Sequence, residues 1–290
     1  MKKHVQKLLL PTLALFIIGC SSDDNSNTSE ESKVEKIIVL DVSLKTDYKA
    51  YNGTNGAVTN EAYRTLKLTH NYNEDGTIGS LSSIGSTTKT DEDTGEVPTY
   101  TVSFSYNKDK TLKQFITRDD QTGEDWWNDS FNYNNQGQLS SKYNSTQDQT
   151  TTYKYSSSGI LNSANIIDQF GSVPFFFTYN NKDQITELAD DTNTTKYERF
   201  KYDNHKTPYA NMNIDLTYAD YELAGVLPIT YKAKNNIVEY TNEYDDLIIY
   251  TDIKYNADGY PSEITNYKDK ERKTITVKTT YTYKTIEIKK

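Results

Sequence analysis

The sequence has 290 residues, with 41 acidic against 32 basic side chains, one Cys and 25 Tyr. The formal charge of -9 argues against nucleic acid as a partner, because phosphate backbones attract basic surfaces. A single Cys excludes an internal disulfide. Abundant Tyr and Thr with little Ala and Met favour strands over long helices, so the composition predicts one large all-β unit.

Residues 1–19 have the pattern of a secretory signal peptide. Three Lys precede an apolar run, residues 8–18, which is too short to hold the chain across a bilayer. The run ends at Ile17-Ile18-Gly19-Cys20, which resembles the lipobox of bacterial lipoproteins. The resemblance implies that residues 1–19 are removed and that Cys20 is the site of lipid attachment.

Residues 20–33 are rich in Ser, Asp, Asn and Glu, and such a composition predicts a disordered tether. The acidic stretch from Asp23 resembles signals that carry some Gram-negative lipoproteins to the cell surface. We therefore expect an outer-membrane protein, held to the membrane by the lipid on Cys20 and displayed at the surface.

One tyrosine-centred pattern recurs along the remaining chain. Most copies have Asn directly after the Tyr and an aliphatic residue six residues after it, and four of the eight have Gly four residues after it. Seven of the eight have an apolar residue two before the Tyr. Asn followed by Gly at this spacing predicts a β-hairpin with a G1 bulge, in which the Tyr faces the aliphatic residue across the ladder. Lys110 and Lys206 replace the Gly in two copies, and there we expect either a different turn or a small backbone strain. The eight tyrosines are Tyr72, Tyr106, Tyr133, Tyr155, Tyr179, Tyr202, Tyr231 and Tyr255.

The repeats predict a single all-β domain over residues 34–290. We expect an antiparallel meander of about 16–18 short strands, forming a curved sheet or a flattened or incomplete barrel. The pattern resembles the tyrosine–aspartate repeats of Rhs and teneurin-type shells, although only Asp203 keeps the Asp after its Tyr. The whole layout is similar to a group of lipoproteins of unknown function with a porin-like fold, a resemblance that implies architecture but no activity. Asp129 and Glu198 are charged residues that fall on the otherwise apolar face of their strands, which we call the apolar parity. Such charges favour a soluble barrel over one embedded in lipid.

One segment interrupts the repeats. Met212, Leu216, Ala219 and Leu223 fall at helical spacing, and Gly225 and Pro228 follow. The spacing predicts a short helix near residues 212–224 that plugs one end or edge of the sheet.

The sequence offers no catalytic site. It lacks HExxH, paired Cys and GxSxG motifs, so we expect no enzymatic activity, no metal and no cofactor. The position of His70 two residues before Tyr72 places it on the apolar face of its strand.

Aromatic residues are the candidate ligand-binding residues. Side chains alternate between the two faces of a strand, and Trp127 falls on the same face as the apolar residues of its repeat. Trp126, Phe176, Tyr197 and Tyr250 fall on the opposite, polar face, which we call the polar parity. Exposed rings of this kind bind sugars by stacking, so we expect a non-enzymatic binding module, with glycans as the candidate ligand. The alternative is a structural or protein-docking component of the envelope. The oligomeric state is left open by the sequence.

Overall fold

The computed structural model describes residues 34–52, 57–87, 99–190, 197–218 and 226–289. The chain divides into Met1–Ser32 and Lys33–Lys290, and every described residue belongs to the second unit. Within it the described residues form sixteen strands: β1 Val34–Asn52, β2 Val58–Tyr72, β3 Ile78–Thr87, β4 Tyr100–Tyr106, β5 Leu112–Asp119, β6 Asp125–Tyr133, β7 Leu139–Asn144, β8 Gln149–Tyr155, β9 Leu161–Asp168, β10 Gly171–Tyr179, β11 Ile185–Asp190, β12 Glu198–Tyr202, β13 Ile237–Asn242, β14 Leu247–Tyr255, β15 Pro261–Tyr267 and β16 Ile275–Lys289.

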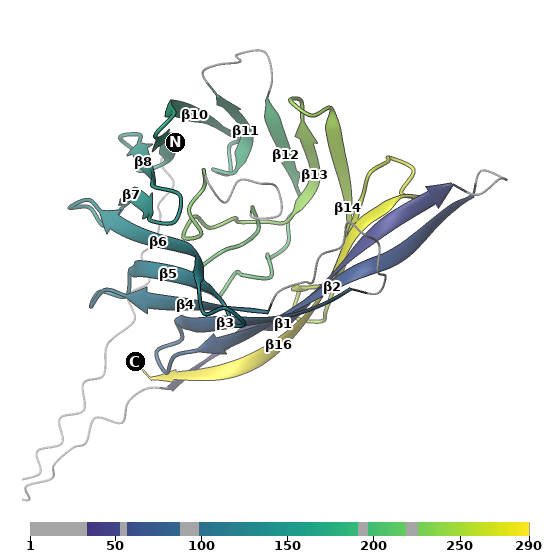
Figure 1. Cartoon of the computed structure of the whole chain (residues 1–290), viewed down its shortest axis with the longest axis horizontal. Coiled ribbons are helices and arrows are strands. Elements are labelled where there is room, and N and C mark those ends of the chain that lie inside the picture. Colours follow the sequence, from purple (N-terminus) through teal and green to yellow (C-terminus); the bar gives the residue numbers. More distant parts are fainter. Residues whose placement is uncertain (1–33, 53–56, 88–98, 191–196, 219–225, 290) are drawn as a thin grey trace, which may run out of the picture. The chain divides into compact units, whose positions relative to one another are not determined.

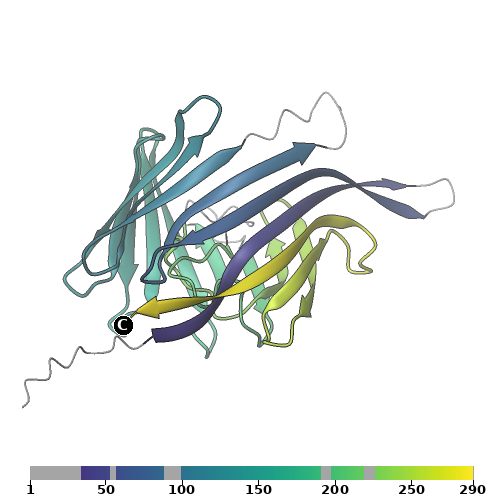
Figure 2. The same cartoon turned by 90° about the horizontal axis from the view of Figure 1, so that it is seen from below.

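Each strand is antiparallel to its neighbours, and β1 pairs with β16, so the sheet is a closed barrel. The expected all-β meander is confirmed, but the flattened or incomplete barrel is wrong. Closure has a physical reason, because β1 and β16 pair from Val34↔Lys289 to Asp47↔Val277 and thereby satisfy the two edges that an open sheet would expose. This long β1–β16 seam is seen in Figure 2, where the purple and yellow strands cross the near face.

The predicted hairpin tips are confirmed at most repeats. Tyr133 pairs with Leu139, the register shifts just before Tyr133, and Gly137 has φ +75°. In the turn, the Asn134 Oδ1 accepts hydrogen bonds from the backbone N–H groups of Gln136 and Gln138, at 2.9 and 3.0 Å. At Lys110, where we expected a different turn or a small strain, the chain takes the same left-handed conformation with φ +65°, which is the strained alternative. The G1-bulge geometry is therefore imposed by the hairpin even where the residue disfavours it.

A ladder of tyrosine hydroxyl groups joins successive hairpins. Each hydroxyl donates to the backbone carbonyl of the aliphatic or Pro residue in the preceding hairpin, as Tyr133 does to Leu112 at 2.9 Å and Tyr155 to Leu139 at 2.9 Å. The remaining pairs are Tyr72 to Leu40, Tyr106 to Ile78, Tyr179 to Leu161, Tyr202 to Ile185 and Tyr283 to Pro261. The repeated tyrosine therefore contacts two hairpins, one through its backbone ladder and one through its hydroxyl group.

Two of the predicted repeats are merged by an insertion. Tyr202 at the end of β12 pairs with Ile237 at the start of β13, and residues 203–236 run between them. We call this segment the plug, and its described residues, 203–218 and 226–236, lie inside the ring of strands in Figure 1. Tyr231 belongs to the plug and forms no hairpin, so the hairpin predicted at Tyr231 is wrong. A barrel of sixteen strands is too wide for its wall side chains alone to fill, and the plug occupies the interior.

The predicted helix is also wrong within the described residues, because residues 203–218 and 226–236 form turns and bends; residues 219–225 lie outside the described ranges. The buried positions Met212 and Ile214 alternate with polar neighbours, which is the period of an extended chain. Asn213 accepts a hydrogen bond from the Ile78 N–H at 3.0 Å and donates one to the Tyr106 hydroxyl at 2.8 Å. These contacts to the barrel wall replace the local hydrogen bonds of a helix.

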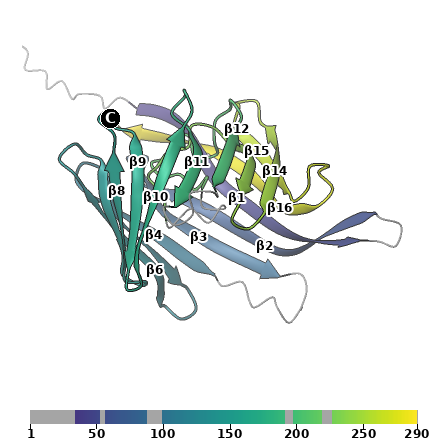
Figure 3. The same ribbon diagram turned by 90° about the horizontal axis from the view of Figure 1, so that it is seen from above.

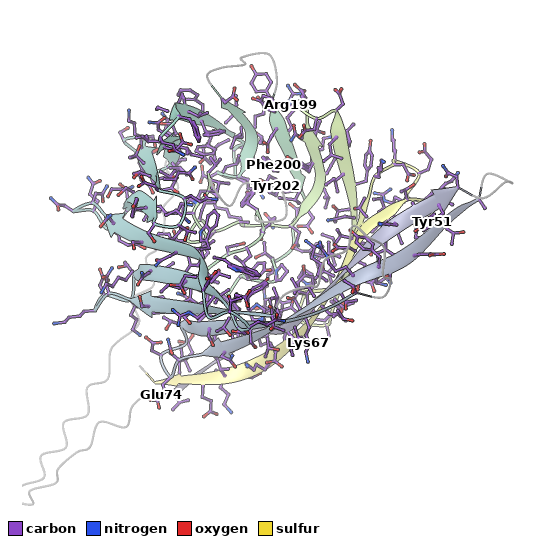
Figure 4. The ribbon with its side chains drawn as sticks, in the orientation of Figure 1. Tyr51, Lys67, Glu74, Arg199, Phe200 and Tyr202 are labelled. Carbon is purple, nitrogen blue, oxygen red and sulfur yellow. The ribbon has the colours of Figure 1, made fainter. Side chains whose placement is uncertain are left out.

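Strand residues alternate between the plug and the outer surface. On β12, Phe200 is buried and Arg199 points outward, an alternation that can be followed at the labelled residues in Figure 4. Outward side chains form ion pairs between strands, such as Lys201–Glu239 at 2.6 Å and Lys254–Glu263 at 2.8 Å. No helix in the described part of the chain has the length and apolar character to cross a membrane.

The β1–β2 hairpin extends past its neighbours as a two-stranded ribbon (Figure 3). Pairing of β1 with β16 ends at Asp47↔Val277, and pairing of β2 with β3 ends at Arg64↔Thr87. The two strands remain paired with each other as far as Asn52↔Val58.

Candidate functional site: an aromatic cavity inside the barrel

An apolar cavity of about 430 Å³ lies between the barrel wall and the plug. Its wall comes from β2 to β6, and its position near the start of β4 and β6 places it toward the end opposite the tyrosine turns. The lining residues are Leu68, Leu81, Tyr100, Val102, Phe104, Phe115, Thr117, Trp126, Trp127, Leu216 and Ile229. A cavity of this size with aromatic and aliphatic walls matches the usual properties of small-molecule sites.

A β-bulge brings both tryptophans into this aromatic cavity. Thr117 pairs with Trp127 and the next residue, Arg118, pairs with Asp125, so Trp126 is the extra residue of β6. The Arg118 Nε donates to Asp125 Oδ1 at 2.8 Å and holds the bulge from outside. The expected outward direction of Trp126 is therefore wrong, because a bulge shifts the alternation of side chains by one position. Trp126 keeps 39% of its surface exposed and lies against the ring of Tyr100, with ring centroids 6.2 Å apart.

The aromatic wall continues behind the tryptophans toward the middle of the barrel. Phe104 and Phe115 have ring centroids 6.2 Å apart, and Phe115 and Phe131 have centroids 6.1 Å apart. Such tilted contacts between rings are favourable and fix the rings relative to one another. The cavity is therefore bounded by side chains that support each other.

The plug supplies the opposite side of the aromatic cavity through Leu216 and Ile229. The Asp215 N–H donates to the Ile229 carbonyl at 2.6 Å, so the two described segments of the plug are joined beside these residues. The Asp215 carboxylate accepts hydrogen bonds from the N–H groups of Thr217 and Ala233, at 2.8 and 3.0 Å. Burial raises the pKa of this carboxyl group, and the two hydrogen bonds oppose that shift.

A buried ion pair lies next to the cavity. Lys142 and Asp129 both point into the barrel with 2% of each side chain exposed, and Nζ lies 3.4 Å from Oδ2. Asn144 donates to the other carboxylate oxygen at 2.8 Å, and the Lys142 Nζ lies 5.8 Å from the ring centroid of Trp127. A buried charge needs such partners, because burial of an unpaired ion is very costly. The sequence signalled Asp129 by its apolar parity, but nothing marked Lys142, whose position depends on the pairing of β6 with β7.

The other predicted ligand residues lie elsewhere. Phe176 on β10 is 47% exposed and lies over a polar outer surface with Lys154 and Asn165. Tyr197 stacks under the Arg199 guanidinium, 5.1 Å from the ring centroid, and Tyr250 pairs with Glu239 on the outer face of β14. These rings are distributed over separate strands and are not brought together with Trp126. Cys20, the signal peptide and the tether lie outside the described residues.

The two histidines of the barrel have different environments. His70 is fully buried, and burial lowers its pKa to about 4, although a 3.2 Å contact of Nδ1 with the Asp41 carbonyl acts in the opposite direction. His205 stacks on Tyr255 with ring centroids 4.2 Å apart. Over the described ranges, no group of three or more His, Cys, Asp or Glu side chains is arranged to hold a metal ion.

Comparison with solved structures identifies the fold class. A porin-like protein from Bacteroides uniformis matches with a TM-score of 0.52 at 12% identity, covering 84% of this chain and 98% of that one. A porin-like protein from Bacteroides vulgatus matches with a TM-score of 0.35 at 11% identity, covering 84% and 99% of the two chains. The toxin complex TcdB2-TccC3-Cdc42 matches with a TM-score of 0.29 at 11% identity, and the match covers 77% of this chain and 11% of that one.

No protein-family model and no curated protein matches the sequence. The chain is thus an all-β protein with a porin-like barrel fold, here a closed sixteen-strand barrel with an internal plug over its described residues.

Proposed function

We propose that this protein is a lipid-anchored, non-enzymatic binding protein of the bacterial cell surface that holds an apolar ring-containing ligand in the aromatic cavity. The observation that carries the proposal is the convergence of Trp126, Trp127 and Tyr100 on one cavity, achieved by a bulge in β6. Bulges beside binding sites commonly redirect a side chain in this way. The cavity lining contains few hydroxyl groups, so its chemistry favours an apolar ligand over a polyhydroxylated one.

The anchor and the location are supported by the sequence pattern that ends at Cys20. The ion pairs on the outer face, including Lys36–Glu287 at 3.1 Å, support a barrel surrounded by water and tethered by its lipid, because a lipid-facing surface excludes such charges. The test is Cys20→Ala in the full-length chain expressed in a Gram-negative host. We expect loss of lipid labelling and of detergent partitioning, and unchanged partitioning of the variant would contradict the anchor.

Ligand binding is tested with N-phenyl-1-naphthylamine, a neutral apolar probe whose fluorescence rises in apolar sites. We expect saturable binding, weakened at least about tenfold by Trp126→Ala, since removal of a contact ring costs 1.4 kcal/mol or more. Phe176→Ala, which removes an exposed ring on the outer face, is the matched control and should bind the probe like the wild type. Absence of saturable binding, or equal loss in both variants, would overturn the proposal.

The glycan hypothesis stays a prediction, and a panel of neutral glycans tested by thermal shift on the same proteins addresses it. Stabilisation by a glycan that depends on Trp126 would assign the aromatic cavity to sugars instead of apolar ligands.

A docking function is the second candidate, and the β1–β2 ribbon is the observation that favours it. A two-stranded ribbon that extends beyond its sheet offers backbone groups for pairing with another protein. A variant in which residues 49–60 are replaced by a short turn should keep probe binding and lose co-purification of an envelope partner. If the shortened variant retains every partner of the wild type, the ribbon is not the docking element.

A further inference from the structure

A second cavity of about 460 Å³ lies at the opposite end of the barrel, among the tyrosine turns. It shares no lining residue with the aromatic cavity. The turns that follow β6, β8 and β10 form one side of it, and the plug forms the other. Its lining residues are Tyr133, Gly137, Leu139, Tyr155, Gly159, Ile160, Leu161, Tyr179, Asp183, Pro228, Thr230, Tyr231, Lys232 and Lys234.

Three consecutive tyrosines of the hydroxyl ladder give this tyrosine-end cavity an aromatic wall. The hydroxyl groups of Tyr133, Tyr155 and Tyr179 donate to backbone carbonyls at 2.6 to 2.9 Å, which fixes the position of each ring. Burial raises the pKa of the three phenols, that of Tyr133 to about 12, so the wall stays uncharged at neutral pH. The hydroxyl oxygens of Tyr133 and Tyr155 keep lone pairs for an incoming donor, while the Tyr179 hydroxyl also bonds the hydroxyl of Tyr231. An aromatic wall with hydroxyl groups at its edge suits a sugar ring, which stacks by its CH face and donates through its hydroxyl groups.

The plug adds positive charge to the same cavity. Lys234 donates to the Lys182 carbonyl at 2.8 Å and pairs with Asp183 at 3.3 Å, so these two charged lining residues compensate each other. Lys232 donates to the Ile214 carbonyl at 3.2 Å, and its ammonium group is the remaining charge of the lining. The charge of the Asp215 carboxylate acts on this ammonium group, and the same carboxylate accepts the two backbone hydrogen bonds described above.

The balance of charge therefore distinguishes this cavity from the chain as a whole. The chain has a formal charge of -9, while the lining carries two ammonium groups and one carboxylate. Lys232 is an exposed residue whose ammonium group donates to the Ile214 carbonyl, so an anionic group of a ligand can approach it and accept a charge-assisted hydrogen bond. The cavity thus combines a stacking wall with a site for one negative charge.

We propose that the tyrosine-end cavity binds an acidic sugar, a glycan unit with a ring carboxylate, with the carboxylate beside Lys232 and the ring against the tyrosine wall. The site is independent of the apolar ligand proposed for the aromatic cavity. Of the two cavities, this one has the polar and cationic groups that a charged glycan requires.

The proposal is tested by isothermal titration calorimetry of the purified protein with digalacturonate and with its neutral counterpart, digalactose. We expect saturable binding of digalacturonate, and at least about tenfold weaker binding of the neutral sugar. Lys232→Gln should weaken digalacturonate binding at least about tenfold. Lys201→Gln, which removes a lysine on the outer face of β12, is the matched control and should bind like the wild type.

Two further variants separate this proposal from folding defects and from the aromatic cavity. Lys232→Arg keeps the charge and should retain most of the binding, even if the melting temperature falls. Trp126→Ala should leave digalacturonate binding unchanged, because Trp126 lines the other cavity. Equal binding of the charged and neutral sugars, equal binding by a folded Lys232→Gln variant, or no binding by the wild type would each overturn the proposal.

Discussion

The hydroxyl group of Tyr255 donates to the carboxylate of Asp203, whereas the other tyrosines of the ladder donate to backbone carbonyls. Asp203 is the first residue of the plug, and the same carboxylate accepts from the Asn236 N–H at 3.1 Å and the Asn236 Nδ2 at 3.0 Å. Asn236 is the last residue of the plug. A single side chain thus binds both ends of a 34-residue insertion and carries the ladder across it. The repeats contain one tyrosine directly followed by aspartate, Tyr202-Asp203, and this aspartate is the residue that joins the two ends of the plug.

The ladder predicts that single tyrosine hydroxyl groups contribute to stability. Tyr133→Phe should lower the free energy of unfolding by about 1 kcal/mol, because it leaves the Leu112 carbonyl without its donor. Tyr143→Phe is the control, since the Tyr143 hydroxyl bonds Asp148 at the exposed surface. Urea unfolding followed by Trp fluorescence measures both variants. An equal effect of the two changes would contradict a structural role for the ladder.

The turns predict opposite effects of two substitutions at equivalent positions. Gly137→Val should destabilise the protein by about 1–3 kcal/mol, because a β-branched residue is strained at φ +75° although the space around it is open. Lys110→Gly should stabilise by about 0.5–1 kcal/mol, because it relieves the same conformation at φ +65°. Melting temperatures of the two variants provide the measurement. A fall in stability for Lys110→Gly would show that its 3.5 Å contact with Asp75 outweighs the backbone strain.

Because the pKa of buried His70 is lowered, we expect the protein to lose stability in mild acid. Its pKa falls from 6.5 in the unfolded chain to about 4 in the barrel, so below pH 6.5 the unfolded state takes up a proton that the folded state does not. The contribution of neutral His70 to the free energy of unfolding is therefore complete above pH 6.5 and falls as the pH drops toward 4. It amounts to about 3 kcal/mol at most.

His70→Phe should remove this part of the pH dependence, because Phe occupies the equivalent position before Tyr106, Tyr133, Tyr179 and Tyr202. Among the described residues, the His70 Nε2 has no hydrogen-bond partner, so the polar contact that Phe removes is the one of Nδ1 with the Asp41 carbonyl. Unfolding in urea at pH 7.5 and pH 5 measures the difference between the variant and the wild type. An unchanged difference would place the acid sensitivity in other groups.

The tandem tryptophans predict a graded effect on stability. Both line the aromatic cavity and neither is fully buried, so Trp127→Ala should cost about 2 kcal/mol, less than truncation of a fully buried ring. Trp126→Ala should cost about 1 kcal/mol, since 39% of Trp126 is exposed. Melting temperature and acrylamide quenching of the two single variants provide the measurement. Strong quenching of Trp127 with none of Trp126 would contradict the bulge in β6.

The hairpins could be predicted because their signals are local: Tyr133, Asn134, Gly137 and Leu139 all lie within one turn. The plug could not be predicted in the same way. Its buried residues Met212 and Ile214 pack against the barrel wall, and spacing along the sequence does not distinguish such an extended segment from a short helix.

The residues that line the aromatic cavity were only partly predictable, because some of its contacts join distant segments. Trp126 was selected as a ring on the polar parity, but only the bulge opposite Arg118 directs it into a cavity. The cavity also needs Leu216 and Ile229 from the plug, and Lys142 approaches Trp127 only through the pairing of β6 with β7. These are contacts between distant segments, so parity and local turn signals do not encode them.

The seam between β16 and β1 repeats the contacts of an ordinary hairpin. Tyr283 pairs with Leu40, the register shifts beside Leu40, and the Tyr283 hydroxyl donates to Pro261. Tyr72 in turn donates to the carbonyl of Leu40. The tyrosine pattern thus runs around the whole circumference without a first or last unit. The β16–β1 seam follows the same pattern as the hairpins. We therefore expect that a hairpin added to or removed from the part of the wall outside the plug would leave the ladder continuous, because a unit there brings both a donor tyrosine and an acceptor carbonyl for its neighbours.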